Sequence, residues 1–514
     1  MIISYSGTYN FICTSLKILK NCVINKFSYF NKYHSQSNTK VVMAAPRNPT
    51  IFPTPSALAK SSTEPFWHSE KHPLHDHRST EVLPDNEVID VVIVGAGYAG
   101  VATAYNLVKD ETSISCPKLS VMILEARSVC SGATGRNGGH LRPDLYGHIP
   151  TYINRAGVRA GAEIAEFEIA HVQALKKLIL REKIDCDFTL TRTCDVWNNQ
   201  EAADRAKATY DSLRLNPKLP YMEDVHFTMG KNAETLSGIK GAKACSTYTA
   251  ATLSPYKLIA SLLASALATG SVNLQTNTPV TSISQSAHGD FLVETPRGII
   301  RARKIVHANN AYVSGLLPEY AKNIVPCKGI CCHISVPKGV TAPLVDNSYI
   351  VRTEDGILDY LIPRPDGSII VGGASATFRP YKEQWYNNVD DGKLIESTME
   401  ERYYENFMQR TFRGWDNSCA KIESIWTGVM GYSFDSNPHI GLVPKKSGQF
   451  IIAGFNGHGM PVIWLAAKGL AEMLRSGKTF EEVRVPMPLP RLFKTTQERI
   501  DRAQNGPDGG DILN

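Results

Sequence analysis

The sequence predicts an α/β fold, and two segments near opposite ends of the chain carry that prediction. Residues 88–94 form an apolar run typical of a buried strand, and a glycine-rich turn and a helical pattern follow it directly. Residues 449–474 repeat the order of strand, glycine-rich loop and helix. Strands that alternate with helices in this way are typical of a parallel sheet covered by helices.

The composition is that of a globular protein with more than one domain. The chain has 514 residues, of which 43% are hydrophobic and 20% are charged, and one domain usually has about 100–200 residues. No run of about 18 apolar residues occurs, so we expect no membrane span. Residues 1–63 hold seven of the 55 basic residues and none of the 49 acidic ones, so the remainder has 48 basic and 49 acidic residues. A near-neutral body gives no electrostatic indication of nucleic-acid binding.

The N-terminus and the cysteines bear on the cellular compartment. Residues 1–42 are basic and acid-free, which fits a working start at Met43, an unstructured leader or a mitochondrial presequence. The 11 cysteines are odd in number and scattered, which favours a reducing compartment over a disulfide framework. We therefore expect a cytoplasmic protein, with a mitochondrial location as the alternative.

Two clusters contain potential metal ligands, and we expect neither to bind a metal. The spacing in each cluster matches no zinc-binding pattern. The first lies in residues 66–78, which we interpret as a surface arm, and the second lies in an apolar run that predicts a buried strand. Their members are His68, His72, His75 and His77 in the first, and Cys327, Cys331, Cys332 and His333 in the second.

The GAGYAG segment, residues 95–100, has the glycine spacing of a dinucleotide-binding turn. Gly95 permits a tight turn, Gly97 lets the backbone approach a pyrophosphate, and Gly100 lets the helix pack closely on the strand. The pyrophosphate then meets the free N–H groups at the start of the helix. A second apolar strand, residues 119–125, ends at Glu125, whose carboxylate can accept hydrogen bonds from a ribose diol. The order of these parts predicts a dinucleotide site.

Two further loops favour FAD over a nicotinamide as the dinucleotide. Residues 131–139 are dense in small residues, which offer backbone N–H groups to a second phosphate and allow close packing on a flat ring. Gly454, Gly457 and Gly459 precede a helical pattern, and a helix N-terminus stabilises the negative charge of a reduced flavin. A nicotinamide oxidoreductase that uses GAGYAG alone is the alternative.

Together these motifs resemble the FAD-dependent D-amino-acid oxidase superfamily. The resemblance extends over residues 64–485 and is carried by GAGYAG, SGATGRNGG (131–139), IWTGVMGYSFDSNPHIG (425–441) and GFNGHGM (454–460). Within the superfamily, the chain is most similar to γ-glutamylputrescine oxidase-like and sarcosine oxidase-like flavoenzymes. The resemblance implies an α/β two-domain flavoenzyme, with a Rossmann-like FAD-binding domain and a mixed-sheet substrate domain.

The resemblance also implies that the two domains alternate along the chain. We expect the FAD-binding domain in residues 64–187, 246–323 and 413–485, and the substrate domain in residues 188–245 and 324–412. Residues 1–63 are then a disordered or leader segment, and residues 486–514 a C-terminal tail. Local patterns agree with this layout, because they predict helices in residues 151–183 and 254–270, a strand over 272–284, and hairpins over 291–310 and 359–373.

The cofactor site implied by the resemblance includes both glycine loops, Glu125 and Arg127, with Val280 meeting the adenine through its backbone. Sarcosine oxidase-like enzymes tether their flavin through a cysteine in the region that matches residues 426–433, and this chain has none there. We therefore expect non-covalent FAD. The residues expected to bind it are Gly95, Ala96, Gly97, Tyr98, Ala99, Gly100, Glu125, Ala126, Arg127, Ser131, Gly132, Ala133, Thr134, Val280, Gly454, Asn456, Gly457, His458, Gly459 and Met460.

The expected reaction is oxidation of a C–N bond in an amine or N-substituted amino compound to an imine, followed by hydrolysis. Amino-acid-oxidising relatives have an arginine where this chain has Met430, and methionine cannot bind a carboxylate. The lysine that faces oxygen in sarcosine oxidase-like enzymes falls near Ile370, so the electron acceptor is either oxygen or another compound. The alternative function is an FAD-binding protein with a structural, sensor or trafficking role and no efficient turnover.

Four polar residues are the candidates for the catalytic site. His140 and Arg142 follow the 131–139 loop closely enough to reach a substrate beside the flavin. Lys328 stands where relatives have a basic residue before a glycine, and Tyr360 begins a strand expected over the flavin ring. Most of the rate acceleration should come from positioning and from the polarised flavin, with no dedicated acid–base pair.

Overall fold

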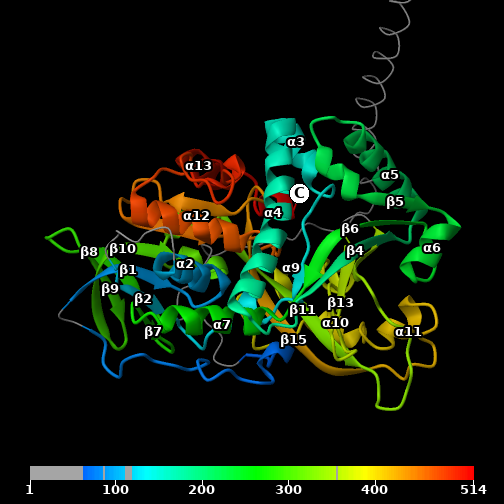
Figure 1. The fold of residues 1–514 in the computed structure, drawn as a ribbon, viewed down its shortest axis with the longest axis horizontal. Coiled ribbons are helices and arrows are strands. Elements are labelled where there is room, and N and C mark those ends of the chain that lie inside the picture. The colour runs from blue at the N-terminus through cyan, green and yellow to red at the C-terminus, as the bar shows by residue number, and fades with distance from the viewer. Residues whose placement is uncertain (1–61, 85–86, 110–117, 355–356, 514) are drawn as a thin grey trace, which may run out of the picture. The chain divides into compact units, whose positions relative to one another are not determined.

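The computed structural model describes residues 62–84, 87–109, 118–354 and 357–513, all of them within one compact unit of the chain. Their strands form two sheets, one of eight strands and one of nine (Figure 1). No helix in these ranges combines the length and the apolar character needed to cross a membrane. The leader, residues 1–61, lies outside the described residues, so the predictions about its role are untested.

The eight-stranded sheet is built around the first predicted strand, β1. Its strand order is β16-β17-β10-β1-β2-β7, with the β8–β9 hairpin joined to β10. β1 pairs in parallel with β10 and β2, as the α/β prediction requires. The strand bounds are β1 Val88–Val94, β2 Val121–Leu124, β7 Val272–Gln275, β8 Ser282–Gln285, β9 Phe291–Thr295, β10 Gly298–His307, β16 His439–Leu442 and β17 Gln449–Ala453.

Both faces of β1 are covered, which explains its continuous apolar sequence. Val91 and Ile93 belong to the core on the helix side, where α2 (Tyr98–Val108) packs between α7 (Pro255–Leu267) and α12 (Ile463–Ser476) (Figure 1). Val92 and Val94 point to the opposite face and pack in the core that β9 and β10 complete. Side chains on a strand alternate between faces, so a strand covered on both sides has no polar face.

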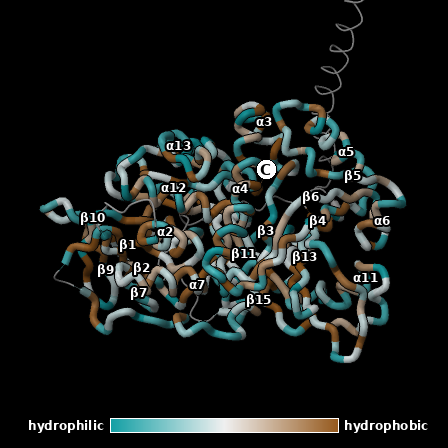
Figure 2. The backbone as a smooth tube through the Cα atoms, in the orientation of Figure 1, coloured by the Kyte–Doolittle hydropathy of each residue, from teal (hydrophilic) through white to brown (hydrophobic). Residues whose placement is uncertain are grey.

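The nine-stranded sheet is mainly antiparallel, and its order is β15-β11-β14-β13-β12-β4-β6-β3, with β5 paired to β6. Only the β12–β4 pair is parallel among the pairings described for this sheet. Figure 2 shows apolar residues along its central strands. The bounds are β3 His140–Leu141, β4 Thr189–Trp197, β5 His226–Met229, β6 Ala244–Thr252, β11 Ile324–Ser335, β12 Ser348–Glu354, β13 Ile357–Pro363, β14 Ile369–Gly372 and β15 Lys421–Ser433.

The remaining helices lie around these sheets. The predicted helical region 151–183 forms α3 and the long α4, and α4 packs against α3 and α12. The expected surface arm, residues 66–78, packs on the body through His68 and His75, whose rings meet the ring of Tyr256 tilted and edge-on, respectively. The helix bounds are α3 Ile149–Ala156, α4 Val158–Glu182, α5 Gln200–Arg214, α6 Lys231–Ser237, α8 Ser375–Phe378, α9 Lys382–Trp385, α10 Glu396–Glu400, α11 Phe407–Thr411 and α13 Gln497–Asn505.

The predicted hairpins over 291–310 and 359–373 are confirmed as β9–β10 and β13–β14. The predicted strand over 272–284 is divided into β7 and β8, because the chain turns at Asn277, which has a φ of +50°. The tail is ordered in its described part, where Asp511 pairs with Arg155 of α3 at 2.7 Å. The domain boundaries stay a prediction, and the nine-stranded sheet includes β3 and β15 from segments assigned to the FAD-binding domain.

Candidate active site

The first glycine loop, residues 95–100, connects β1 to α2 and leaves no room for a side chain at Gly95 or Gly100. Gly95 has a φ of +111°, and a Cβ atom there would lie 2.9 Å from the Ala308 carbonyl oxygen. A Cβ atom on Gly100 would lie 1.9 Å from the Gly95 carbonyl oxygen. The helix therefore touches the end of the strand backbone to backbone, which is the close approach a dinucleotide-binding turn requires.

Glu125 ends β2 beside this loop, and its carboxylate is held in a fixed position. Oε2 accepts a hydrogen bond from the Ala96 N–H at 2.8 Å, and Oε1 accepts one from the Arg127 N–H at 2.9 Å. Both oxygens keep lone pairs for further donors, because a carboxylate accepts up to about four hydrogen bonds. The side chain can therefore bind a ribose diol as predicted.

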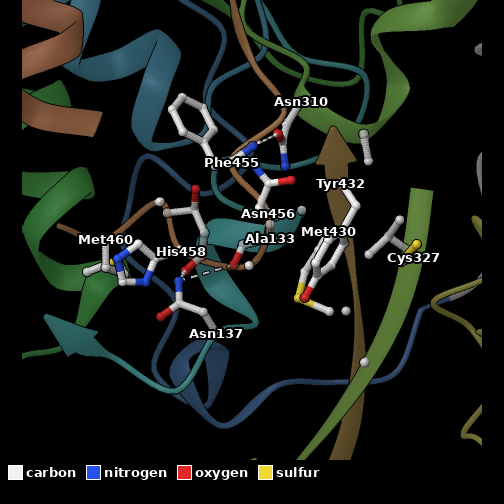
Figure 3. Close-up of a pocket in the computed structure, with 18 of the residues that line it drawn as sticks. Ala133, Asn137, Asn310, Cys327, Met430, Tyr432, Phe455, Asn456, His458 and Met460 are labelled. Carbon is white, nitrogen blue, oxygen red and sulfur yellow. Dashed lines mark hydrogen bonds between the residues drawn. The ribbon is translucent and has the colours of Figure 1, made fainter. Parts of the chain in front are cut away.

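The second glycine loop, residues 454–459, follows β17 and is fixed by asparagine side chains. The Gly454 N–H donates to Asn310 Oδ1 at 2.9 Å, and the Ser433 N–H donates to Asn456 Oδ1 at 2.7 Å. Figure 3 shows Asn310, Asn456 and His458 around this loop. Helix α12 begins only at Ile463, so a short turn separates the glycines from the helix that they were expected to open.

Both glycine loops line one cavity of about 740 Å³. This volume lies within the range of about 300–1,000 Å³ that is usual for ligand pockets. All four catalytic candidates, His140, Arg142, Lys328 and Tyr360, also line it. The predicted FAD-binding residues on its wall are Gly95, Gly97, Tyr98, Ala99, Glu125, Ala126, Arg127, Gly132, Ala133, Thr134, Val280, Asn456, Gly457, His458, Gly459 and Met460.

The other four predicted FAD-binding residues are not part of the cavity wall. Ala96 and Gly100 support the first loop from behind, through the Glu125 hydrogen bond and the strand contact described above. Gly454 is held by Asn310, and Ser131 is buried with a hydroxyl oxygen that has no partner among the described residues. Whether these four touch a cofactor stays a prediction.

His140 and Tyr360 form uncharged parts of the wall. His140 Nε2 lies 2.7 Å from Ser348 Oγ, and desolvation together with the charges of Arg142 and His458 holds the pKa of the imidazole well below its usual value. Tyr360 Oη lies 3.0 Å from Cys331 Sγ, and burial raises the pKa of the phenol well above 10. Both side chains are therefore neutral at pH 7.

A second wall is formed by the paired strands β11 and β15. Cys327 lies opposite Met430 in the register of these strands, and both residues line the cavity (Figure 3). Burial raises the pKa of the Cys327 thiol to about 12 and that of the Cys331 thiol to about 11. Lys328 follows on β11, and burial lowers the pKa of its ammonium group against the opposing effect of Asp390 and Asp391. Ile370 is fully buried in the core and does not line the cavity.

Comparisons with known proteins agree with this geometry. The sequence model of the FAD dependent oxidoreductase (DAO) family matches residues 90–473, which is most of the chain. The protein belongs to this family of FAD dependent oxidoreductases. A relative among curated proteins is the γ-glutamylputrescine oxidoreductase of Escherichia coli, which is 23% identical over 404 residues, covering 77% of this chain and 85% of the relative.

Solved structures of other flavoenzymes share the fold of this FAD dependent oxidoreductase. The L-proline dehydrogenase of P. horikoshii superposes with a TM-score of 0.60 at 21% identity, over 79% of this chain and 98% of the other. The glycine oxidase of Geobacillus kaustophilus superposes with a TM-score of 0.60 at 19% identity, over 78% of this chain and 98% of the other. The α/β two-domain prediction and the family prediction are thereby confirmed.

The residues present fit FAD. The glycines at 95 and 100 let the strand, the loop and the helix pack backbone to backbone, Glu125 offers acceptors for the ribose, and the second loop lies in the same cavity. The Arg127 guanidinium on the cavity wall is held in place by Asp391, which binds its Nη1 through both carboxylate oxygens at 2.9 and 3.0 Å. The thiols of Cys327 and Cys331 are protonated in this environment, because burial raises the pKa of both, and non-covalent binding of the flavin stays a prediction.

Sequence reasoning missed several charged residues of this FAD dependent oxidoreductase. The cavity is also lined by Asp144, Glu168 and Arg352, and Asp195 lies directly behind Arg142. Glu168 Oε2 accepts hydrogen bonds from the Asp144 N–H at 2.7 Å and pairs with His458 Nε2 at 2.9 Å. The sequence offered little signal for Asp195 and Arg352, because β4 and β12 each contain a second charged residue, Arg192 and Glu354 respectively.

Proposed function

We propose that this protein oxidises the C–N bond of an amine to an imine, which water then hydrolyses to a carbonyl compound and a shorter amine or ammonia. The observation that carries this proposal is that two loops suited to FAD and four polar candidate residues line one cavity. The curated relative named for γ-glutamylputrescine supports an amine as the substrate class. The oxidation removes two electrons and two protons from the H–C–N–H unit, and the hydrolysis adds one water molecule.

The side chains that line the cavity position the amine and set the polarity around it. Bound FAD supplies the two-electron acceptor. Neutral His140, which has one ring nitrogen at the Ser348 hydroxyl, can bind an uncharged amine without electrostatic repulsion. Tyr360 closes the wall against Gly138 and Cys331, which restricts the access of water to the reacting face. These features hold the amine rather than transfer its protons, so positioning provides most of the acceleration.

The residue at position 430 narrows the substrate class. Met430 lies beside the second glycine loop, where a Cβ atom on Gly457 would be 3.2 Å from its sulfur. A thioether cannot form the two parallel hydrogen bonds with which an arginine binds a carboxylate. We therefore propose an amine whose reacting nitrogen has no neighbouring carboxylate.

Anaerobic mixing of the purified holoprotein with amines tests the proposal. The panel contains polyamines, N-methyl amino acids and γ-glutamyl amines, and the measurement is bleaching of the flavin absorbance by stopped flow. We expect at least one amine to bleach the flavin and N-methyl α-amino acids to be poor substrates. A flavin that every amine leaves oxidised would contradict the proposal and favour a structural, sensor or trafficking role. Re-oxidation with oxygen, compared with an artificial acceptor, then identifies the acceptor class.

The same measurement tests the role assigned to His140. We expect His140→Ala to keep its flavin and to reduce it about 10- to 100-fold more slowly, because the amine loses one positioning contact. An unchanged rate at full flavin content would remove His140 from the site.

A further inference from the structure

Arg142 is a buried guanidinium group with unused hydrogen-bond donors. Its side chain is 10% exposed, and its Nη2 donates to Asp195 Oδ2 at 2.8 Å. Its Nε is buried and has no partner, and its Nη1 makes no hydrogen bond to any described residue. Buried donors almost always have a partner in a functioning protein, so these N–H groups need an explanation.

Arg352 on β12 provides a second guanidinium group at the same place. Its Nη2 lies 3.6 Å from the Asp195 oxygen that Arg142 binds, and its side chain is 24% exposed at the cavity wall. This separation is too long for a hydrogen bond, and the Arg352 guanidinium donates none to the residues that the structure describes. Both arginines therefore present free donors to the same cavity.

The charges in this unit, Arg142, Asp195 and Arg352, do not balance. Two guanidinium groups share one carboxylate, and the other neighbours of Asp195 are the hydroxyl groups of Tyr146 and Tyr248, at 2.9 and 3.4 Å. Burial raises the pKa of both phenols well above 10, so neither adds a negative charge. The unit therefore has one more positive than negative charge within itself, and the nearby Asp144 carboxylate also helps to raise the pKa of the Arg142 guanidinium.

The other carboxylates on this part of the wall already have partners. Asp144 accepts hydrogen bonds from the N–H groups of Gly147 and His148 and pairs with the His148 ring, and Glu168 pairs with His458. Neither makes a described contact with the free donors of Arg142 or Arg352. The free N–H donors of the two arginines can therefore be satisfied by an anionic ligand in the cavity.

This unit is far from position 430 in the nine-stranded sheet. Met430 lies on β15 at one edge, and Arg352 lies on β12, four steps along the strand order. Adjacent strands are about 4.8 Å apart, so the two positions are separated by roughly 19 Å along the sheet. A group bound by the two arginines is not the α-carboxylate that an arginine at position 430 would hold.

We propose that Arg142 and Arg352, held by Asp195, bind a carboxylate that the amine substrate carries away from its reacting nitrogen. Two adjacent guanidinium groups with free N–H donors match the planar, bidentate geometry of a carboxylate. The preferred substrate is then an amine with a distal carboxylate. This inference rests on the proposed amine oxidation, and the experiment below separates the failure of one from the failure of the other.

The experiment compares amines that differ only in the distal group. The probes are 4-aminobutanoate, 6-aminohexanoate and 8-aminooctanoate, each paired with the n-alkylamine of the same chain length, and the measurement is the anaerobic rate of flavin reduction at limiting amine. In the unmodified enzyme, one carboxylated length should react roughly 10- to 100-fold faster than its alkylamine, since a hydrogen-bonded charge contact is gained. Arg352→Gln should abolish this preference, measured as the ratio of the rate with the carboxylated amine to the rate with its alkylamine.

Two further variants make the result specific. Arg352→Lys keeps the charge without the forked donors and should restore only part of the preference. Arg159→Gln removes an arginine from the surface of α4, where the side chain is 85% exposed, and should leave the preference unchanged. Flavin content and the urea midpoint of each variant confirm that it is folded.

Binding of adipate to the holoenzyme, measured by titration calorimetry, tests the subsite without turnover. Adipate should bind the unmodified enzyme at least about tenfold more tightly than Arg352→Gln. If alkylamines bleach the flavin but carboxylated amines have no advantage at any length, the inference is wrong and the amine oxidation stands. If no amine bleaches the flavin, the proposed function fails, and the subsite is then tested by the calorimetry alone. Equal adipate affinities of the unmodified enzyme and Arg352→Gln would overturn the subsite.

Discussion

The two ends of the cavity differ in the residue types that form them. At the glycine-loop end, Gly95 on the wall and Gly100 behind it are required because a Cβ atom on either would collide with a backbone carbonyl oxygen. At the end beside β3, β4 and β12, the wall is formed by charged side chains, with Arg142 on Asp195 and Arg352 beside them. The first end requires residues without a side chain, and the second requires oppositely charged side chains that pair with one another.

This difference predicts two kinds of failure. Adding an atom at the glycine-loop end should cost the cofactor, because the loop can no longer approach it. Removing a charge at the other end should cost stability and substrate recognition, because a buried partner is left without compensation. Flavin content and unfolding free energy, measured together, separate the two.

The largest effect is expected at Gly100. In Gly100→Ala, the new Cβ atom would lie 1.9 Å from the Gly95 carbonyl oxygen, so α2 must move away from β1. Overpacking of this kind costs about 1–3 kcal/mol or more, and we expect the purified variant to lose most of its flavin. The flavin-to-protein absorbance ratio after desalting is the measurement. The control is Asn106→Ala on the same helix, which should keep its flavin, and a fully loaded Gly100→Ala protein would contradict the comparison.

Asp195→Ala is the matching change at the charged end. Arg142 would lose its buried partner, and breaking a buried ion pair in this way typically costs about 3–5 kcal/mol. We expect a lower urea midpoint in a variant whose folded fraction keeps its flavin. Asp416→Ala removes an exposed carboxylate that pairs with Lys240 and should leave the midpoint in place. Loss of flavin from folded Asp195→Ala would show that the two ends are not independent.

The pH dependence of the unfolding free energy tests the protonation of three buried histidines. Burial lowers the pKa of His68 and His171 to about 3 and that of His307 to about 4. These values lie below the unfolded value of about 6.5, so the unfolded chain binds protons first as the pH falls. Each histidine therefore removes up to about 1.4 kcal/mol of stability per pH unit below about pH 6.5.

Urea unfolding at pH 7.5, 6.5 and 5.5 checks this sign. The unmodified protein should be less stable at pH 5.5, and His171→Gln should have a shallower slope by up to about 1.4 kcal/mol per pH unit. His288 lies in an exposed loop, so His288→Gln serves as the control with an unchanged slope. A flat profile between pH 6.5 and 5.5 in the unmodified protein would contradict the assignment.

The smallest effect is expected at Cys327. This thiol is the cysteine opposite Met430 and lines the cavity, but its raised pKa keeps it protonated. Acid precipitation should leave the flavin in the supernatant for the unmodified protein and for Cys327→Ala alike. A flavin that stays with the pellet in the unmodified protein only would reveal a covalent bond to this residue.

The glycine-loop end could be predicted from the sequence because its requirements are local. The spacing of Gly95, Gly97 and Gly100 after an apolar strand follows from one turn and one helix start, which lie within a dozen residues. Glu125 followed from the end of the next strand in the same sheet. The buried faces of β1 were predictable for the same reason, because alternation along a strand is a property of a short segment.

The charged end could not be predicted in the same way. Arg142, Asp195 and Arg352 are distant in the sequence and meet only because β12 pairs in parallel with β4 and β3 pairs with β6. Even Cys327, noticed as part of a cysteine cluster, became relevant to the flavin only through its register with Met430.

The sequence by itself determined the α/β class, the dinucleotide loops and the FAD family, because each depends on residue types at short, fixed spacings. The tertiary structure decided which charges face one another across the cavity and which of them keep free donors. Strand order and register set those contacts, and both depend on how the whole sheet packs rather than on any single segment.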